Sequence, residues 1–205
     1  MTIKSLTTDK QGTIVIPESP SDWDDWVSAS RTRNYVLDDP LIDWLDLYGE
    51  SKGYQKDPKD ERTDFNMFTM NQGIRFEAHA VEYLKQVAQV KTIWEGDYLG
   101  RYDLSTSEDT FEAMQRGVQI IYQGTLRDAD SKTYGSPDFL VRSDVINELF
   151  PNTIKPEEAS ISAPDLDNSK WHYIVVDSKF ATLNLASRTS SLRNTEKTRA
   201  YKVQV

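Results

Sequence analysis

The feature that most restricts how this chain can fold is the heptapeptide IVVDSKF, residues 174–180. Three β-branched apolar residues are typical of a buried strand, whereas the aspartate and the lysine that follow them are costly to bury. Because side chains alternate along a strand, Asp177 and Lys179 share one face and Ser178 points away from it. The pattern predicts a strand that carries two charged side chains to a polar site at the edge of a core.

A second strand is expected to carry a matching carboxylate at its start. Pro137-Asp138 directly precedes the apolar run Phe-Leu-Val, whereas the (D/E)-x-K triplet occurs four times and only the copy at Asp177 follows an apolar run. Aspartates at two neighbouring strand ends make a set of hard oxygen ligands suited to Mg²⁺ or Mn²⁺. We therefore expect a metal site at Asp138 and Asp177, with Lys179 beside it to hold a water molecule or an oxyanion.

A helix over about residues 65–90 is expected to add a third carboxylate. Glu77 shares one helix face with Val81, Leu84 and Ala88, so it is the polar member of an apolar stripe. A carboxylate directed toward a core needs a partner or a metal ion, although a place at the edge of the stripe would let it reach solvent. His79 lies on the opposite side and is the alternative ligand; the stripe favours Glu77.

The chain divides near residue 64 into an N-terminal part and a core. Residues 1–21 predict a polar arm with a short strand, and residues 22–48 predict two amphipathic helices that are broken near Asp39-Pro40. Residues 49–64 are charged and punctuated by Gly and Pro, which indicates a loop. We expect an N-terminal arm and helical segment over 1–64 and a core over 65–205.

Within the core, alternating apolar runs predict a set of strands. Ser107 is expected to cap a short helix that ends before Gly117, and 150–170 reads as an inserted loop. A helix from about residue 191 is still running at Val205, which predicts a longer protein with a further domain or a partner beyond that point. The expected strands are 92–98, 117–126, 135–142 and 171–180, with a turn near residues 128–130.

The composition excludes several classes of site. The absence of cysteine excludes disulfides, thiolate zinc sites, iron–sulfur clusters and cysteine nucleophiles. No signal peptide and no membrane-length apolar run is present, which predicts a soluble intracellular protein with no membrane partner.

The charge distribution is uneven. The net charge of −9 argues against a general polyanion binder, yet residues 179–205 hold 6 basic side chains and 1 acidic one. This basic stretch fits a solvated helix face and a nucleic-acid contact equally well.

The order of these motifs resembles the PD-(D/E)XK nuclease superfamily, and within it the RecB-like branch. GIRFEAHAVEYL is similar to the first helix of that family, YGSPDFLVRSD to its glycine–aspartate strand, and AYKVQV to the start of its glutamine-bearing helix. WVSASRTRNYVLDDP resembles its N-terminal Ser-x-Ser segment. The resemblance implies an α/β fold with a restriction-endonuclease-like core, a mixed central β-sheet flanked by helices, and a small helical N-terminal segment.

The resemblance also implies roles for individual residues. Asp138 and Asp177 would bind Mg²⁺ or Mn²⁺ with the carbonyl of Ser178, and Glu77 would bind it directly or through water. Lys179 would position or deprotonate the attacking water and stabilise the reacting phosphate. The residues implied to contact nucleic acid are Arg188, Arg193, Lys202 and Gln204.

The activity implied is metal-dependent hydrolysis of DNA phosphodiester bonds, by an exonuclease or an endonuclease. RNA fits the same metal chemistry. Some relatives bind an iron–sulfur cluster through a Cys-Pro where this chain has Asp39-Pro40, so no cluster is expected.

Two other readings fit the same residues. One is a catalytically silent nuclease-like module that binds DNA or a protein partner; the other is a structural α/β domain in which Asp177 and Lys179 form an exposed ion pair. Glu77, Asp138, Asp177 and Lys179 are all in place, which favours the enzyme.

Overall fold

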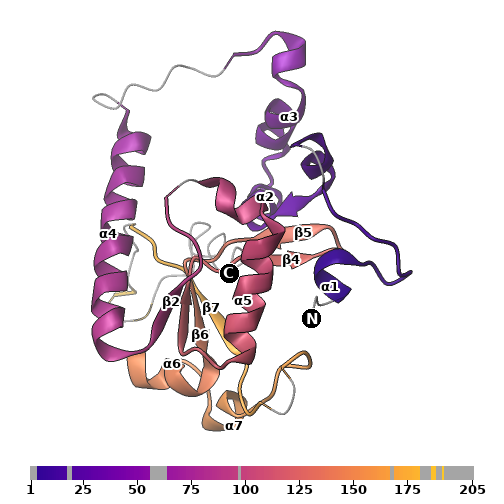
Figure 1. The fold of residues 1–205 in the computed structure, drawn as a ribbon. Coiled ribbons are helices and arrows are strands. Elements are labelled where there is room, and N and C mark those ends of the chain that lie inside the picture. The colour runs from indigo at the N-terminus through magenta and orange to yellow at the C-terminus, as the bar shows by residue number, and fades with distance from the viewer. Residues whose placement is uncertain are drawn as a thin grey trace.

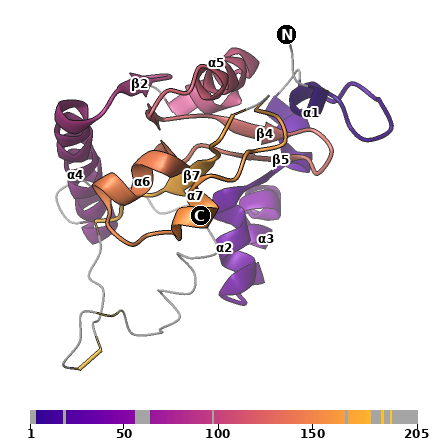
Figure 2. The same ribbon diagram turned by 90° about the horizontal axis from the view of Figure 1, so that it is seen from below.

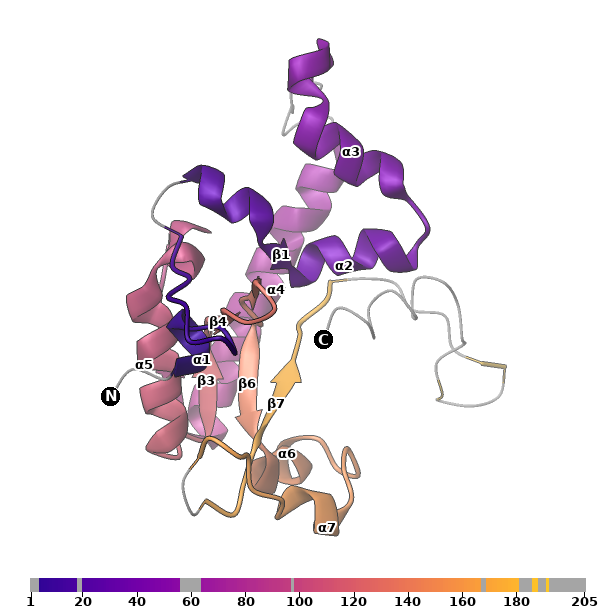
Figure 3. The same ribbon diagram turned by 90° about the vertical axis from the view of Figure 1, so that its right-hand side faces the viewer.

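The chain forms a mixed α/β structure with two small sheets (Figure 1). A computed structural model gives the arrangement. Helices lie along the flanks of the larger sheet, and the helices of residues 29–48 lie beyond one end of its strands (Figures 1 and 3). The structure describes residues 4–17, 20–55, 64–96, 98–166, 169–180, 186–187 and 191.

The larger sheet has the strand order β2-β3-β6-β7. Strand β2 is parallel to β3, whereas β6 is antiparallel to both of its neighbours. The antiparallel pairing of β6 with β7 places the start of one strand beside the end of the other. The strands are β2 (Val90–Thr92), β3 (Ile120–Tyr122), β6 (Phe139–Arg142) and β7 (Tyr173–Val176).

Both faces of this sheet are covered by helices, which explains why its central strands are apolar at successive positions. Ile120 and Val141 face a cluster shared with α4 and α6, and Ile121 and Leu140 face a cluster shared with α5. Figure 2 shows the sheet between α5 on one side and α4 with α6 on the other. The helices are α4 (Phe65–Val87), α5 (Leu104–Gln115) and α6 (Ser143–Leu149).

The smaller sheet joins the N-terminal segment to the core. Its order is β1-β5-β4, and β1 pairs in parallel with β5 through Val27 and Thr133. Trp26, directly before β1, is buried, and the guanidinium of Arg127 lies over its ring, so the N-terminal segment is anchored by packing as well as by strand pairing. These strands are β1 (Val27–Ser28), β4 (Leu126–Asp128) and β5 (Thr133–Gly135).

The remaining elements are short and peripheral to the main sheet. Leu6 of the first helix is buried, and that helix packs against β4. They are α1 (Lys4–Thr7), η1 (Pro20–Asp25), α2 (Ala29–Val36), α3 (Pro40–Tyr48), η2 (Glu50–Lys52), η3 (Tyr98–Tyr102) and α7 (Pro156–Ala159).

The long helix and the break at proline are confirmed. Helix α4 begins after Asp64, whose side chain accepts hydrogen bonds from two backbone N–H groups of the first turn, and it ends three residues before the expected boundary. Helix α3 begins at Pro40, as the restriction on the residue before proline requires. The buried stripe on α4 contains Val81 and Leu84, as the periodicity predicted.

The prediction of a strand over 92–98 is wrong in position. The extended backbone begins at Val90 because Ala88 caps α4 in an extended conformation and the chain pairs at once with β3. The predicted cap at Ser107 is also wrong: Asp103 caps α5, and Ser107 is buried inside the helix. Asp103, one turn upstream, is the cap because its carboxylate accepts a hydrogen bond of 2.9 Å from the backbone N–H of Ser105.

The two long strands expected over 117–126 and 135–142 are each divided. Gln123 has a positive φ of +53°, which turns the chain and ends β3. The next strand, β4, belongs to the smaller sheet. Residues 129–132 form the expected turn and β5 returns toward β6. The strand expected over residues 13–16 is reduced to a single bridge between Thr8 and Ile14.

One expectation falls on a part of the chain that the structure does not describe, and another is answered for the described helices. The helix expected from residue 191, with Arg188, Arg193, Lys202 and Gln204, lies outside the described residues. Among the described helices, none combines the length and the hydropathy that crossing a membrane requires.

Candidate active site

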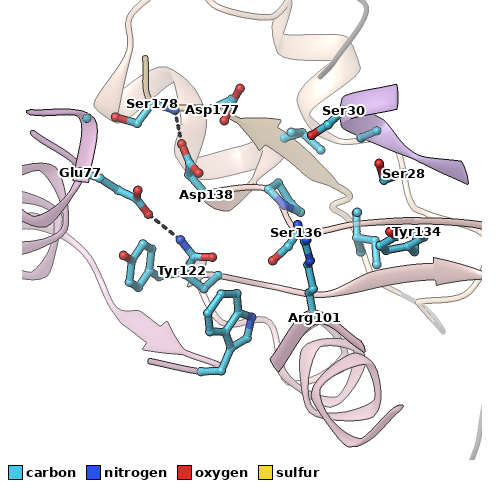
Figure 4. Close-up of a pocket in the computed structure, with 18 of the residues that line it drawn as sticks. Ser28, Ser30, Glu77, Arg101, Tyr122, Tyr134, Ser136, Asp138, Asp177 and Ser178 are labelled. Atoms are coloured by element: carbon cyan, nitrogen blue, oxygen red, sulfur yellow. Dashed lines mark hydrogen bonds between the residues drawn. The ribbon is translucent and has the colours of Figure 1, made fainter. Parts of the chain in front are cut away.

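The ends of two antiparallel strands bring Asp138 and Asp177 together. Phe139 at the start of β6 is paired with Val176 at the end of β7, so the residue before one faces the residue after the other. The backbone N–H of Ser178 donates a hydrogen bond of 2.6 Å to Asp138 Oδ2, which locks the two strand ends to each other (Figure 4). The convergence of carboxylates expected from the motifs is present.

The Asp138 carboxyl lies in an environment that disfavours its charge. Burial, a side-chain hydrogen bond with Asp177 and the negative charges of Asp177 and Glu77 raise the pKa of Asp138 to about 7, against a lowering by the Ser178 N–H group. Two carboxyls in one partly buried place retain a proton because their negative charges repel each other. The Asp138 carboxyl therefore holds its proton more strongly than an exposed aspartate does.

Lys179 lies beside this pair. Its Nζ is 2.5 Å from Asp177 Oδ2, and the two side chains are 35% and 15% exposed, respectively. The lysine and the aspartate share a face, as the alternation along the strand predicted. The ammonium group is thus placed at the boundary between the buried carboxyls and solvent.

Glu77 reaches the site from α4 but is held by residues at the end of β3. Its Oε1 accepts a hydrogen bond of 2.5 Å from the amide Nε2 of Gln123 (Figure 4). Burial, then a hydrogen bond to Glu77, raises the pKa of the Tyr122 hydroxyl to about 12. In the described part of the chain, no group of three or more acidic or histidine side chains is arranged to hold a metal ion.

Gln123 is the site residue that motif reading did not find. It adopts a left-handed backbone with φ of +53°, which is uncommon outside glycine, and its N–H donates to the carbonyl of Asp138 at 2.9 Å. Its side chain reaches Glu77, so one residue links the elements that carry two of the predicted carboxylates. The available signal was a glutamine that follows the aromatic end of a strand and precedes Gly124.

The site opens into a cleft of about 1210 Å³. One wall is α4 and the ends of β3, β6 and β7; the other is the smaller sheet with the start of α2, including Ser28 and Ser30 (Figure 4). The Ser-x-Ser segment that the sequence suggested thus faces the carboxyls across the cleft.

Two further predicted positions are placed by the structure. His79 is exposed and is not part of the cleft wall, whereas Glu77 is. The hydroxyl of Ser178 is buried, lies beside the cleft and has no hydrogen-bond partner within the described part of the chain. Among the candidate metal ligands, Asp138 lies next to Asp177 and Ser178, where the ends of β6 and β7 meet. Glu77 is instead hydrogen-bonded to Gln123.

Comparison with known proteins identifies no relative: no protein-family model, no curated protein and no solved structure matches the chain at a significant level.

Proposed function

We propose that the chain is a divalent-metal-dependent nuclease of the PD-(D/E)XK superfamily, RecB-like branch, which hydrolyses phosphodiester bonds of DNA. The observation that carries the proposal is the partly buried Asp138–Asp177 pair with Lys179 beside it, at the wall of a large cleft. The sheet with helices on both faces supports a restriction-endonuclease-like core. The strands of the larger sheet follow their order in the chain, β2-β3-β6-β7, with Asp138 directly before β6 and Asp177 directly after β7.

The residues present fit a hard divalent cation. Asp138 and Asp177 offer carboxylate oxygens, the ligands that Mg²⁺ and Mn²⁺ prefer. Burial and the neighbouring carboxyls raise the pKa of Asp138 to about 7, so a positive charge beside the pair is favoured, and a divalent cation would supply it. The proposed ligands are Asp138, Asp177 and the Ser178 carbonyl, with Glu77 bound directly or through water.

A Mg²⁺ or Mn²⁺ ion at this position would supply Lewis-acid activation of water and neutralise charge on the phosphate. Asp138 and Asp177 fix where the reacting phosphate lies, because their backbones are joined by strand pairing and by the Ser178 N–H bond. Lys179 donates its N–H groups to the attacking water and to the phosphate oxygens, and its positive charge stabilises the added negative charge. Burial strengthens each of these interactions.

A second candidate is a catalytically silent nuclease-like module that binds DNA or a protein. The observation that favours it is the engagement of Glu77 with Gln123 and Tyr122, which leaves two carboxyls rather than three beside Lys179. The two candidates make opposite predictions for cleavage.

The test uses purified protein, a Lys179→Ala variant and a matched Lys155→Ala control, since Lys155 is exposed and remote from the cleft wall. Each is incubated with linear and circular DNA, single- and double-stranded, in Mg²⁺, Mn²⁺ or EDTA. We expect cleavage that requires metal, is lost in Lys179→Ala by about two orders of magnitude or more, and is retained in the control.

Comparison of linear with circular substrates separates an exonuclease from an endonuclease. Metal binding without cleavage of any substrate would favour the silent module. An absence of both cleavage and any response to metal ions would rule out the active-site assignment.

A further inference from the structure

Trp94 follows β2 closely and lies at the edge of the larger sheet where the carboxyls lie. Thr92, at the end of β2, pairs with Tyr122, at the end of β3, and Tyr122 pairs in turn with Phe139, at the start of β6. The backbone N–H of Ile93 donates to the carbonyl of Tyr122 at 3.0 Å, which extends the contact up to the residue before Trp94. Neighbouring strands lie about 4.8 Å apart, so two strand spacings put the end of β2 about 10 Å from the start of β6.

The side chain of Trp94 is built into the wall of the cleft. Trp94 is partly exposed and lines the cleft. Gly100 lies so close to it that a Cβ at Gly100 would be 2.9 Å from two ring atoms, Cγ and Cδ2, so glycine is required beside the indole. Thr106 Oγ1 donates to the Gly100 carbonyl at 2.8 Å, which ties this backbone to α5. A ring held in this way loses little conformational entropy when a ligand packs on it.

The indole N–H group of Trp94 is buried and has no hydrogen-bond partner within the described part of the chain. A buried tryptophan N–H normally finds an acceptor, because leaving it unpaired costs folding free energy. A phenylalanine would fill much of the same space without this cost, so stability alone does not explain the tryptophan. Local costs of this kind are typical of functional sites, and the larger indole offers more ring surface to a ligand.

Two other aromatic side chains line the cleft, and both pack on further rings. The ring of Tyr122 packs on Phe139 with centroids 5.4 Å apart, and that of Tyr134 packs on Trp23 with centroids 4.8 Å apart. The ring of Trp94 packs on glycine backbone. Of these three rings, the indole is the one that we assign to a planar ligand.

We propose, resting on the nuclease function above, that Trp94 stacks on an unpaired base of the DNA strand whose phosphate lies at Asp138 and Asp177, so that the substrate is single-stranded there. Stacking needs a free base face, which a base inside a duplex does not present. Every base has such a face, so the contact selects single strands and not a sequence. The ring contacts a nucleotide close to the reacting phosphate and takes no part in the chemical step.

The test compares DNA strands with and without bases. A fluorescein-labelled thymidine oligonucleotide and a strand of the same length made of abasic nucleotides are titrated by fluorescence anisotropy, in EDTA and again with Ca²⁺. The two strands carry the same phosphates, so a difference in Kd between them reports contacts with bases. The KM for cleavage of the thymidine strand in Mg²⁺ is the second readout.

The proteins are wild type, Trp94→Ala, Trp94→Phe and Trp171→Phe. Trp171 is the matched control, because its indole N–H is also buried without a partner among the described residues and it lies outside the cleft wall. We expect wild type to bind the thymidine strand about tenfold more tightly than the abasic strand, and Trp94→Ala to lose this difference and to raise KM. Trp94→Phe keeps a smaller ring and should retain part of the difference, whereas Trp171→Phe should match wild type.

Equal Kd values of wild type for the two strands would overturn the stacking contact, even if wild type cleaves DNA. A folded Trp94→Ala that keeps both the difference and the wild-type KM would overturn it too. If Trp94→Ala does not fold, Trp94→Phe decides: a smaller difference supports the contact, and an unchanged one overturns it. Wild type that neither binds nor cleaves DNA would overturn the proposed function, and the stacking contact with it.

Discussion

Asp138 and Gln123 show how single residues combine stability with site geometry. Asp138 is a partly buried carboxyl whose charge is disfavoured, and Gln123 holds a backbone conformation that most residues avoid. Both features cost folding free energy, and such local costs gather at functional sites because binding requires groups that a stable core would exclude. Each can be tested through stability as well as through activity.

The first prediction concerns Asp138→Asn in EDTA. The pKa of Asp138 is raised from its ordinary value of 3.8 to about 7 in the folded chain, so the folded state binds more protons than the unfolded state between these pH values. Stability from this group is present below pH 3.8 and is lost as pH rises to about 7. We expect Asp138→Asn to be more stable than wild type above pH 7, by about 1–3 kcal/mol.

Urea unfolding of both proteins at several pH values measures the difference. It should shrink toward zero as the pH approaches 3.8, because the wild-type carboxyl is then protonated in both states. A difference that stays constant with pH would contradict the raised pKa.

The second prediction concerns Gln123→Gly. Glycine adopts a positive φ without strain, so we expect stability within about 1 kcal/mol of wild type. Glu77 loses the N–H group that orients it, and metal-dependent cleavage should fall about tenfold or more.

Thermal unfolding and the metal dependence of kcat and KM measure the two effects separately. Asn152→Gly is the matched control, since Asn152 also has a positive φ, at +63°, and lies in an exposed loop. Equal loss of activity in the two variants would show that Gln123 does not position Glu77.

Short elements with polar ends position the site. The strands β6 and β7 have four residues each; Asp138 directly precedes β6, and Asp177 directly follows β7. Local sequence predicts these strand ends well, because the apolar strand residues and the charged residues beside them are neighbours in the chain. Asp138 and Asp177 were therefore found from the sequence, whereas the exact ends of β2 and α5 were not, since strand pairing and a competing aspartate cap decided them.

The third prediction concerns the start of α4, the helix that carries Glu77. Asp64 Oδ1 accepts from Asn66 N–H at 2.8 Å and from Met67 N–H at 3.3 Å. We expect Asp64→Ala to lower stability by about 0.5–2 kcal/mol, whereas Asp64→Ser keeps a capping oxygen and loses less. Chemical denaturation of the three proteins tests this, and equal stability of wild type and Asp64→Ala would show that the cap contributes nothing.

At the scale of the whole molecule, the cleft depends on two sheets that no local pattern connects. The smaller sheet combines β1 from the N-terminal segment with β4 and β5 from the core. It forms the wall opposite Asp138 and carries residues on both sides of the chain's expected boundary at residue 64. The cleft is thus a property of the assembled chain.

The fourth prediction concerns the stability of the molecule with metal ions. A ligand that binds only the folded state stabilises it by about 2.7 kcal/mol at a concentration of 100 times its Kd. We expect excess Mn²⁺ to raise Tm by about 5–10 °C relative to EDTA. Differential scanning calorimetry with Asp138→Asn as control measures this, and an equal rise in that variant would place the ion elsewhere.

The sequence by itself determined the long helix α4, the break at Pro40 and the carboxylates at the ends of β6 and β7. The apolar stripe on α4, the break at Pro40 and the charges after β7 are all encoded by neighbouring residues, whose periodicity and propensity act locally. The orientation of Glu77 was decided by the tertiary structure. Its hydrogen bond to Gln123 joins residues 46 positions apart, and the cleft wall joins segments still further apart. Such contacts depend on packing and strand pairing over long separations, which local patterns do not encode.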